Sequence, residues 1–267
     1  MKITVVTVAY NEEKNIARTI ESVLNQSATE FEYIVCDGLS KDRTVEIAKS
    51  YDEAFAKKGI SYRVFSEKDR GIYDAMNKGI QHASGQYIWF LNAGDWLCNE
   101  GVLARFIQEI QEEDGPAVIY ADYYYVDNHR ASRFECDDSL LRERMSMGHP
   151  SMIARTDIMR GTMFDISYRI AADYNFVLGL KLAGQTFKRL DMCATYFIAG
   201  GISGTAREQT NEELRRMRGY YGLPHEDIVE ERISAMERLK HALVSVVPVG
   251  MWRFWTEKIK HKEWIEY

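Results

Sequence analysis

Short apolar runs alternate with helical patterns along the first part of the chain, and this order constrains the fold more than any other feature. The runs cover residues 3–9, 33–36, 62–65 and 87–91, and each is too short to form a helix. The segments between them place apolar residues at helical spacing. We therefore predict parallel βαβ units, whose right-handed crossovers bring the carboxyl ends of the strands to one edge of a sheet.

The composition is that of a globular soluble chain. Of the 267 residues, 46% are hydrophobic and 28% are charged, which is enough to bury one large core or two smaller ones. The formal net charge of −6 argues against nucleic acid as a partner, because neutralising phosphates needs a basic face. We expect no secretion signal, because the chain opens directly on the first strand.

The cysteines are far apart in the sequence and form no CxxC pair. They are Cys36, Cys98, Cys136 and Cys193. This spacing is not that of a paired-cysteine motif. We therefore expect reduced thiols in a cytoplasmic protein.

Polar residues follow every one of the four predicted strands. They are Asn11, Asp37, the group at 67–70, and Asn92 with Asp95. Because open α/β sheets bind ligands at the carboxyl ends of their strands, we expect a site for a charged ligand there. Oxygen ligands after the fourth strand suit Mg²⁺ or Mn²⁺.

Helices are expected between these strands. Asn11 is expected to cap the first helix, whose buried stripe includes Ile16 and Ile20. The turn at residues 37–44 is expected to open a single second helix that continues to Phe55.

The second half is less regular. We expect a helix at 101–110, a strand at 117–126 with a hairpin partner at 130–134, a helix at 171–182 and a strand at 186–198. Gly200, Gly201 and Ser203 follow the last strand, in a flexible loop whose backbone amides can approach an anion.

Several of these segments together resemble a family 2 glycosyltransferase of the GT-A fold. The resemblance rests on Thr7 and Asn11, the DGxSxDxT turn at 37–44, the segment 69–95 and the later IAADYNF segment. More narrowly, GIYDAMNKGI followed by FLNAGD is similar to bacterial enzymes that assemble capsule, O-antigen or colanic-acid-type polysaccharides. The resemblance implies an α/β fold with a Rossmann-like, mostly parallel central sheet flanked by helices, and a helical C-terminal extension.

The resemblance also implies an organisation and a reaction. Residues 1–110 would form the donor-binding half, 111–215 the acceptor-binding and catalytic half of the same domain, and 216–267 a helical amphipathic extension. The reaction would be an inverting transfer from a UDP- or GDP-sugar to a hydroxyl of a growing, lipid-linked bacterial surface glycan. A homo-oligomer is compatible with this reaction and is left open.

In such an enzyme, residues at the strand ends would hold the donor. The nucleoside would be held by Thr7, Ala9, Asn11 and Asp37. The phosphates and the sugar would be held by Asp69, Arg70, Asn92, Ala93, Gly94 and Asp95. A helix-turn cap is the structural alternative for Asp37, and a solvated charged loop is the alternative for Asp69 and Arg70.

The implied metal site departs from the family pattern. Most relatives carry two acids at this strand end, whereas this chain has Asn92 and a single carboxylate, Asp95. One carboxylate with the donor phosphates still suits Mg²⁺ or Mn²⁺. His149 would be a further ligand or would touch the leaving phosphate, but a hydrogen bond in a loop explains it equally well. The acceptor or phosphate loop would comprise His149, Gly200, Gly201 and Ser203.

Asp173, in the first turn of the helix expected at 171–182, is the candidate catalytic base. In the implied reaction, a carboxylate removes the proton of the acceptor hydroxyl as its oxygen attacks the anomeric carbon. The structural alternative is that Asp173 stabilises the start of its helix, a role that is compatible with catalysis. We favour Asp173 over Asp165.

The C-terminal segment 242–255 raises the question of location. It is mostly apolar, is interrupted by Pro248 and Gly250, and is too short to span a bilayer. Tryptophans among lysines suit a segment in the headgroup region, which would place the enzyme at the inner face of the cytoplasmic membrane. A dimer contact or core packing explains the same pattern.

Two rival functions stay open. A sugar nucleotidyltransferase shares nucleotide-binding α/β topology and metal chemistry, and a catalytically silent nucleotide-sugar binding protein would explain Asn92. A dehydrogenase or a P-loop enzyme is disfavoured, because neither GxGxxG nor GxxxxGK followed by Ser or Thr occurs.

Overall fold

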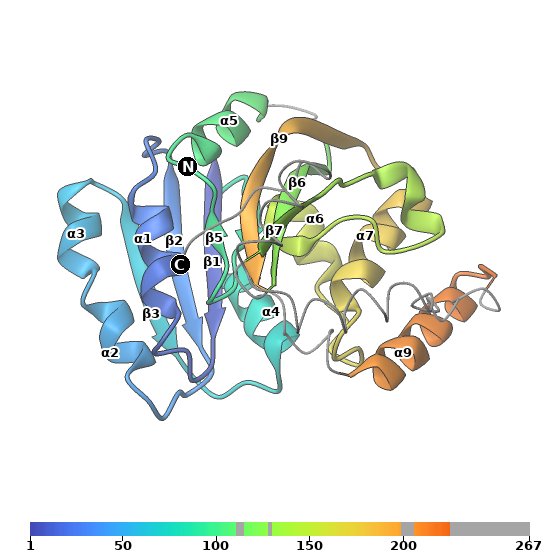
Figure 1. Cartoon of the computed structure of the whole chain (residues 1–267), viewed down its shortest axis with the longest axis horizontal. Helices are drawn as coiled ribbons and strands as arrows, with labels where there is room; N and C mark the ends of the chain where they lie inside the picture. Colours follow the sequence, from blue (N-terminus) through green and yellow to red (C-terminus); the bar gives the residue numbers. More distant parts are fainter. Residues whose placement is uncertain (111–114, 128–129, 199–205, 225–267) are drawn as a thin grey trace, which may run out of the picture.

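The computed structural model describes residues 1–110, 115–127, 130–198 and 206–224 (Figure 1). Within these residues, one nine-stranded sheet has the order β3-β2-β1-β4-β8-β6-β9-β5, and β7 pairs with β6. The strands are β1 Ile3–Ala9, β2 Phe31–Asp37, β3 Ser61–Ser66, β4 Tyr87–Phe90, β5 Trp96–Leu97, β6 Val118–Asp127, β7 Arg130–Phe134, β8 Met152–Arg155 and β9 Phe187–Ile198. The predicted α/β fold is confirmed.

The amino-terminal part of the sheet is parallel, as the alternation of strands and helices predicts. β1 pairs with β2 and β4, so that Val6 lies between Ile34 and Phe90, and β2 pairs with β3. β8 then runs antiparallel to both β4 and β6, while β6 and β9 are parallel. The carboxyl ends of the first four strands therefore lie at one edge of the sheet.

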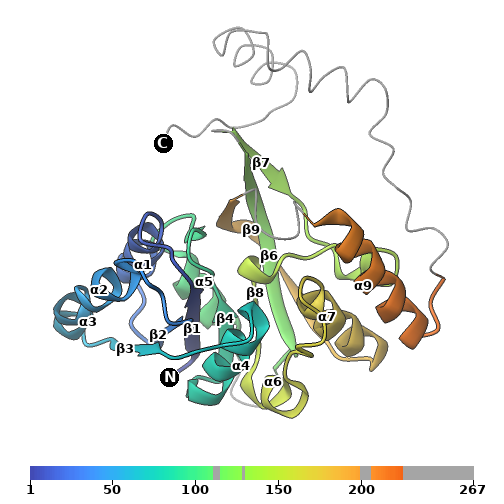
Figure 2. The ribbon, with the colours of Figure 1, turned by 90° about the horizontal axis from the view of Figure 1, so that it is seen from below.

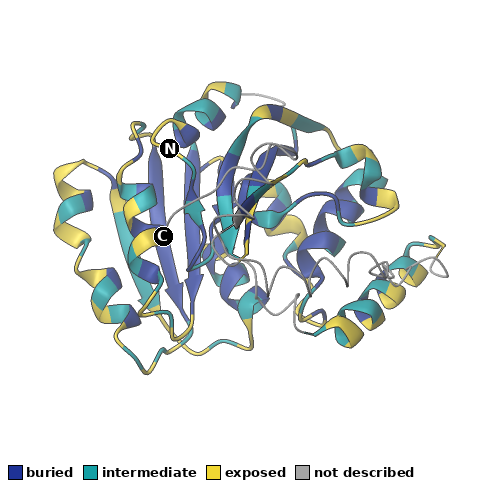
Figure 3. Cartoon of the chain, viewed as in Figure 1, coloured by how far each residue is buried: buried dark blue, intermediate teal, exposed yellow. Residues whose placement is uncertain are grey.

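Helices cover both faces of the sheet (Figures 1 and 2). They are α1 Ile16–Leu24, α2 Thr44–Lys49, α3 Asp52–Lys57, α4 Ile72–His82, α5 Val102–Glu109, α6 Thr156–Thr162, α7 Ala172–Leu182 and α9 Arg207–Tyr220, with short 3₁₀ turns η1 Asp138–Arg142 and η2 His149–Ser151. Helices α1, α2, α3 and α5 share a core with Val5, and α4, α6 and α7 share a second core with Val6. Neighbouring β1 residues thus face opposite cores, and the sheet between them is buried (Figure 3).

Two expectations about the first helices are wrong. α1 begins at Ile16 with no side-chain cap, and Asn11 instead accepts a hydrogen bond from the backbone N–H of Lys41 at 2.8 Å. Asn11 has a φ of 56°, a backbone conformation that asparagine tolerates better than most residues. It lies in a turn, and its side chain connects the loop after β1 with the loop after β2. The single helix expected to reach Phe55 is divided into α2 and α3, and Phe55 stacks on Tyr62 of β3.

The remaining expectations concern the C-terminal part and the thiols. The helical extension was expected from residue 216, whereas α9 begins at Arg207 and so crosses that boundary. The division into three regions stays a prediction. The segment 242–255 lies outside the described residues. No helix in the described part of the chain is long and apolar enough to cross a bilayer. Cys36 and Cys136 are buried, and Cys98 and Cys193 are partly buried. The expectation of reduced thiols stays a prediction.

Candidate active site

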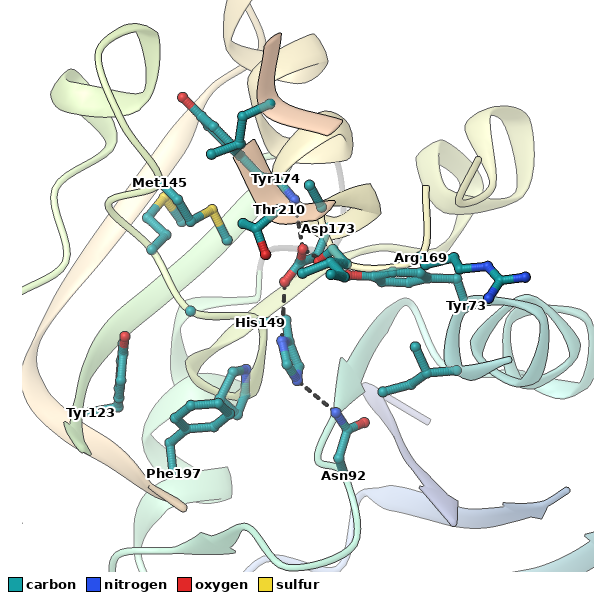
Figure 4. Close-up of a pocket in the computed structure, with 17 residues that line it drawn as sticks. Tyr73, Asn92, Tyr123, Met145, His149, Arg169, Asp173, Tyr174, Phe197 and Thr210 are labelled. Carbon is teal, nitrogen blue, oxygen red and sulfur yellow. Dashed lines mark hydrogen bonds and ion pairs between the residues drawn. The ribbon is translucent and has the colours of Figure 1, made fainter. Parts of the chain in front are cut away.

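A chain of three side chains connects the end of β4 with the start of α7 (Figure 4). His149 Nδ1 lies 3.1 Å from Asp173 Oδ2, and His149 Nε2 lies 2.7 Å from Asn92 Nδ2. Because an amide nitrogen can only donate, Nε2 is the acceptor and Nδ1 carries the proton directed at Asp173. Segments far apart in the sequence therefore meet at one carboxylate.

Asp173 is buried and held by further contacts at its other oxygen. Its Oδ1 accepts a hydrogen bond from the backbone N–H of Tyr174 at 2.9 Å and lies 3.0 Å from the Tyr73 hydroxyl. Burial, and then the negative charge of Asp173, raise the pKa of Tyr73 well above its ordinary value. Tyr73 therefore keeps its hydroxyl proton, which it shares between Asp173 Oδ1 and the Ile170 carbonyl at 2.6 Å.

Helix α9 supports the start of the helix that carries Asp173. The Glu213 carboxylate accepts hydrogen bonds from the backbone N–H groups of Arg169, Ile170 and Ala171 at 2.9, 2.9 and 3.0 Å. These amides precede the first residue of α7 and would otherwise lack partners. Glu213 is itself buried, so its carboxylate is committed to this contact.

The protonation of His149 depends on its acidic neighbours. Burial lowers the pKa of His149, but the hydrogen bond to Asp173 and the charges of Asp173 and Asp95 raise it by more. The net shift is upward from the ordinary value of 6.5. Asp173 and Asp95 therefore stabilise the protonated form of His149 relative to a free imidazole. In that form both ring nitrogens donate, so Nε2 would face the side-chain oxygen of Asn92 in place of its nitrogen.

Asp95 lies in the turn that follows β4. Its Oδ1 accepts a hydrogen bond from the backbone N–H of Ile198 at 3.1 Å. The Thr19 hydroxyl donates to the backbone carbonyl of Asp95 and accepts a hydrogen bond from the Gly94 N–H. Gly94 has a φ of 106°, a conformation that favours glycine. Burial raises the pKa of Asp95 to about 7, although the charge of His149 and the Ile198 N–H oppose the rise.

The end of β2 carries a second buried carboxylate. Asp37 Oδ2 accepts hydrogen bonds from Ser40 N at 3.0 Å and from Ser66 Oγ at 2.6 Å. Asp37 Oδ1 is buried and has no partner among the described residues. A buried acceptor without a partner is costly, and it marks a place where a ligand hydroxyl or N–H can bind.

The other predicted donor residues divide into buried and exposed groups. Thr7 is buried, and its hydroxyl donates to the Leu91 carbonyl at 2.7 Å. Ala9 is also buried, and it lies opposite Asp37 in the pairing of β1 with β2. Asp69 accepts from Gly71 N at 2.9 Å, and the exposed Arg70 pairs with Asp74 at 2.9 Å. The donor roles of these residues stay predictions.

The structure also places the remaining candidates. Asp165 is exposed and accepts a hydrogen bond from Ser167 N at 2.9 Å, away from the three-residue chain. Gly200, Gly201 and Ser203 lie outside the described residues. Tyr73 and Glu213 were not identified from sequence, because each meets the site through contacts between distant segments.

A cavity of about 340 Å³ lies beside Asp173, lined by residues of α4, η2, α7 and α9. Among the described residues that line it, Asp173 is the only carboxylate. Asn92 and His149 also contribute to the lining. An alcohol bound here would therefore meet one group able to accept its proton.

Asp95 and Asn92 offer few protein ligands to a divalent ion. No group of three or more His, Cys, Asp or Glu side chains in the described part of the chain is arranged to hold a metal. Asp95 offers a carboxylate, and Asn92 Oδ1 is buried without a hydrogen-bond partner. Such a set suits Mg²⁺ or Mn²⁺ bound mainly through substrate phosphates. Both ring nitrogens of His149 already have partners, so coordination would require it to release Asn92.

Taken together, a parallel sheet with carboxylates at its ligand-binding edge, and an acid on a later helix beside a cavity, define an α/β enzyme of the GT-A type. The chain belongs to glycosyl transferase family 2, whose model matches residues 4–171. It is therefore a glycosyltransferase, as the sequence motifs predict.

Individual relatives agree with this assignment. A Mycobacterium tuberculosis protein named "PGL/p-HBAD biosynthesis glycosyltransferase" is 29% identical over 204 residues, covering 74% of this chain and 77% of the relative. The S. aureus protein TarS 1–349, solved in complex with UDP-GlcNAc, is similar in fold, with a TM-score of 0.67, 20% identity, and coverage of 97% of this chain and 76% of TarS 1–349.

A third protein is similar in fold. The mannosyltransferase PcManGT from Pyrobaculum calidifontis, solved with GDP-Man and Mn²⁺, gives a TM-score of 0.64 at 15% identity. The likeness covers 82% of this chain and 64% of PcManGT. At these identities the two solved structures show the shared fold alone.

Proposed function

We propose that this protein is an inverting glycosyltransferase that moves a sugar from a nucleoside-diphosphate sugar to a hydroxyl of a bacterial surface glycan or its lipid-linked precursor. The observation that carries the proposal is Asp173, the one carboxylate among the described residues of the cavity wall, joined through His149 and Asn92 to the end of β4. The complexes of TarS 1–349 with UDP-GlcNAc and of PcManGT with GDP-Man and Mn²⁺ support a nucleotide-sugar donor.

The donor would lie along the carboxyl edge of the sheet. Asp37, with an unpartnered buried oxygen, would accept a hydrogen bond from the base or ribose. The diphosphate would lie at the turn containing Asp95, where Mg²⁺ or Mn²⁺ would be held by Asp95 and the phosphates. When bound, the ion would offset negative charge that develops on the departing diphosphate.

The chemical step would take place beside Asp173. The acceptor oxygen forms a bond to the anomeric carbon as the bond to the phosphate oxygen breaks, and the nucleoside diphosphate leaves with that electron pair. Asp173 takes the proton of the hydroxyl, a role that typically contributes about 10²- to 10⁴-fold to the rate. Attack opposite the leaving group inverts the anomeric configuration. The His149 N–H and the Tyr73 hydroxyl hold the carboxylate in place.

A panel of UDP- and GDP-sugars tests this proposal. With Mg²⁺ or Mn²⁺ present, we expect one donor to release its nucleoside diphosphate, and NMR of the product to show an anomeric configuration opposite to that of the donor. Retention of configuration would contradict the inverting mechanism. Release of pyrophosphate from a nucleoside triphosphate would favour a nucleotidyltransferase, and nucleotide binding without turnover would favour a silent binding protein.

A further inference from the structure

The cavity beside Asp173 extends away from the donor edge. In Figure 4, Asn92 lies on one side of Asp173, whereas Met145, Tyr174 and Thr210 lie on the other. Its volume of about 340 Å³ is near the lower end of the range for small-molecule sites, about 300–1,000 Å³. The space therefore suits one ring or a short chain beside the reacting hydroxyl.

Most polar groups of the lining already have partners inside the protein. The Tyr73 hydroxyl lies 2.6 Å from the Ile170 carbonyl, the Tyr174 hydroxyl donates to Leu141 O at 2.7 Å, and the Thr210 hydroxyl donates to Ala206 O at 3.0 Å. Both nitrogens of His149 are engaged as well. The hydrogen-bond donors of these groups are therefore engaged, and for a ligand the hydroxyls keep only acceptor capacity.

Apolar side chains from separate elements complete the lining. They are Ile72, Met145, Met147, Pro150, Phe197 and Leu214. Phe197 meets the His149 ring edge to face, with centroids 6.1 Å apart. Methionine and aromatic side chains adapt to flat or flexible apolar ligands. Figure 4 shows the Arg169 guanidinium directed away from Asp173.

Part of this lining is outside the segment that matches the family model. Phe197, Thr210 and Leu214 lie beyond residue 171, whereas Asn92 and His149 lie within it. Met145, which lies on the same side as Thr210, belongs to the matched segment, so both parts of the chain contribute to this side of the cavity.

We propose that the cavity receives an apolar group, aromatic or alkyl, positioned directly beside the hydroxyl that is glycosylated. The acceptor is then an amphiphile whose attacked hydroxyl is close to its apolar part, and not an interior unit of a long hydrated glycan. This inference rests on the proposed function, because it takes the alcohol at Asp173 to be the acceptor.

Matched pairs of glycosides test the proposal. The probes are methyl and phenyl pyranosides of glucose, galactose, mannose and N-acetylglucosamine, and their affinity for the full chain is measured by titration NMR. For at least one sugar we expect the phenyl glycoside to bind about tenfold more tightly than its methyl partner, because burial of a phenyl ring is worth at least that factor. No preference for phenyl with any sugar, including undetectable binding of both members of every pair, would overturn the proposal.

Two lining variants and one control locate the effect. Leu214→Gln on α9 and Met145→Gln before η2 should each reduce the phenyl preference several-fold, and either suffices if the other fails to fold. Leu182→Gln makes the same change at a half-buried leucine at the opposite end of α7 and should leave the preference unchanged. A preference that survives in a folded lining variant would place the phenyl group elsewhere and overturn the proposal.

Turnover distinguishes this inference from the proposed function. If a nucleotide sugar is consumed but methyl and phenyl acceptors react with equal kcat/KM, the apolar acceptor site is wrong and the transferase stands. If the phenyl preference and its loss in the lining variants are observed, but no donor in the panel reacts, the cavity is an apolar glycoside site and the proposed reaction fails.

Discussion

At the residue scale, the central feature is the way Asp173 is held. One oxygen faces His149, and the other faces Tyr73 and the Tyr174 N–H, so the carboxylate has a single orientation at the cavity wall. The side-chain amide of Asn92 lies 2.7 Å from His149 Nε2 and fixes the ring of His149. Asn92 therefore has a structural role.

The ion pair of His149 and Asp173 predicts a pH dependence of stability. The pKa of His149 is raised in the folded protein, so the stability it contributes is fully present below its unfolded pKa and is lost as the pH rises through the folded pKa. We expect His149→Asn, in metal-free buffer, to lower the free energy of unfolding more at about pH 6 than at about pH 9. Urea denaturation at both pH values measures this.

The control for this prediction is the double-mutant cycle. In an Asp173→Asn background, His149→Asn should lose most of its dependence on pH, because the main charge that raises the pKa of His149 has been removed. A cost of His149→Asn that is the same at both pH values in the otherwise native chain would contradict the assigned pairing.

At the element scale, α9 is the link between the C-terminal part and the candidate base. Its carboxylate at Glu213 occupies three backbone amides at the start of α7, and its Thr210 and Leu214 line the cavity. Because the residues immediately before α7 are held in this way, Asp173 keeps a fixed position at the start of the helix. Helix α9 is therefore part of the cavity that we propose for the acceptor.

Removal of the Glu213 carboxylate should weaken both the fold and the reaction. Glu213→Ala leaves three amides without their partner, and we expect a loss of about 2–3 kcal/mol in the free energy of unfolding. We also expect kcat to fall more than the affinity for nucleotide, because the change displaces Asp173 and not the donor edge. Glu212→Ala, at the exposed neighbouring position, should change neither quantity appreciably. Equal behaviour of the two variants would show that α9 does not position α7.

The elements predicted from sequence are those with a strong local signal. The apolar run of β1 and the helical stripe of α4 needed no distant partner to be recognised. Asp173 was predicted from the IAADYNF segment, which carries part of the family resemblance. Helix α9 gave no such signal, because only Glu213 and Met217 along it are buried. Tyr73 could not be assigned to the site, because it meets Asp173 across a separation of 100 residues.

At the scale of the whole molecule, the fold consists of a parallel half that carries Asp37 and Asp95 and a mixed half that carries His149 and Asp173. The two halves are joined through β4 and β8, whose antiparallel pairing was not expected, because β8 has only four residues. The parallel pairing of β1, β2, β3 and β4 places the ends of these strands at one edge of the sheet. The antiparallel strand β8 then joins this half to the rest of the sheet.

The C-terminal segment 242–255 leads to a prediction for the whole chain. If the tryptophans of this segment and the lysines on either side of it lie in a headgroup region, the protein should co-sediment with liposomes that contain anionic lipid. A chain ending before Ala242 should not. High salt should weaken the binding, because part of it is electrostatic. Equal sedimentation of the full and shortened chains would reject membrane contact and leave a dimer contact or core packing as the explanation.

The kinetics of Asp173→Asn test the central claim most directly. An asparagine amide keeps the shape of the side chain but cannot take the hydroxyl proton, so we expect transfer to fall by about 10²-fold or more, with nucleotide affinity unchanged. Asp165→Asn, at the exposed acid seven residues from the helix start, should leave both quantities as they are. Retention of most of the transfer rate by Asp173→Asn would contradict the assignment of Asp173 as the base.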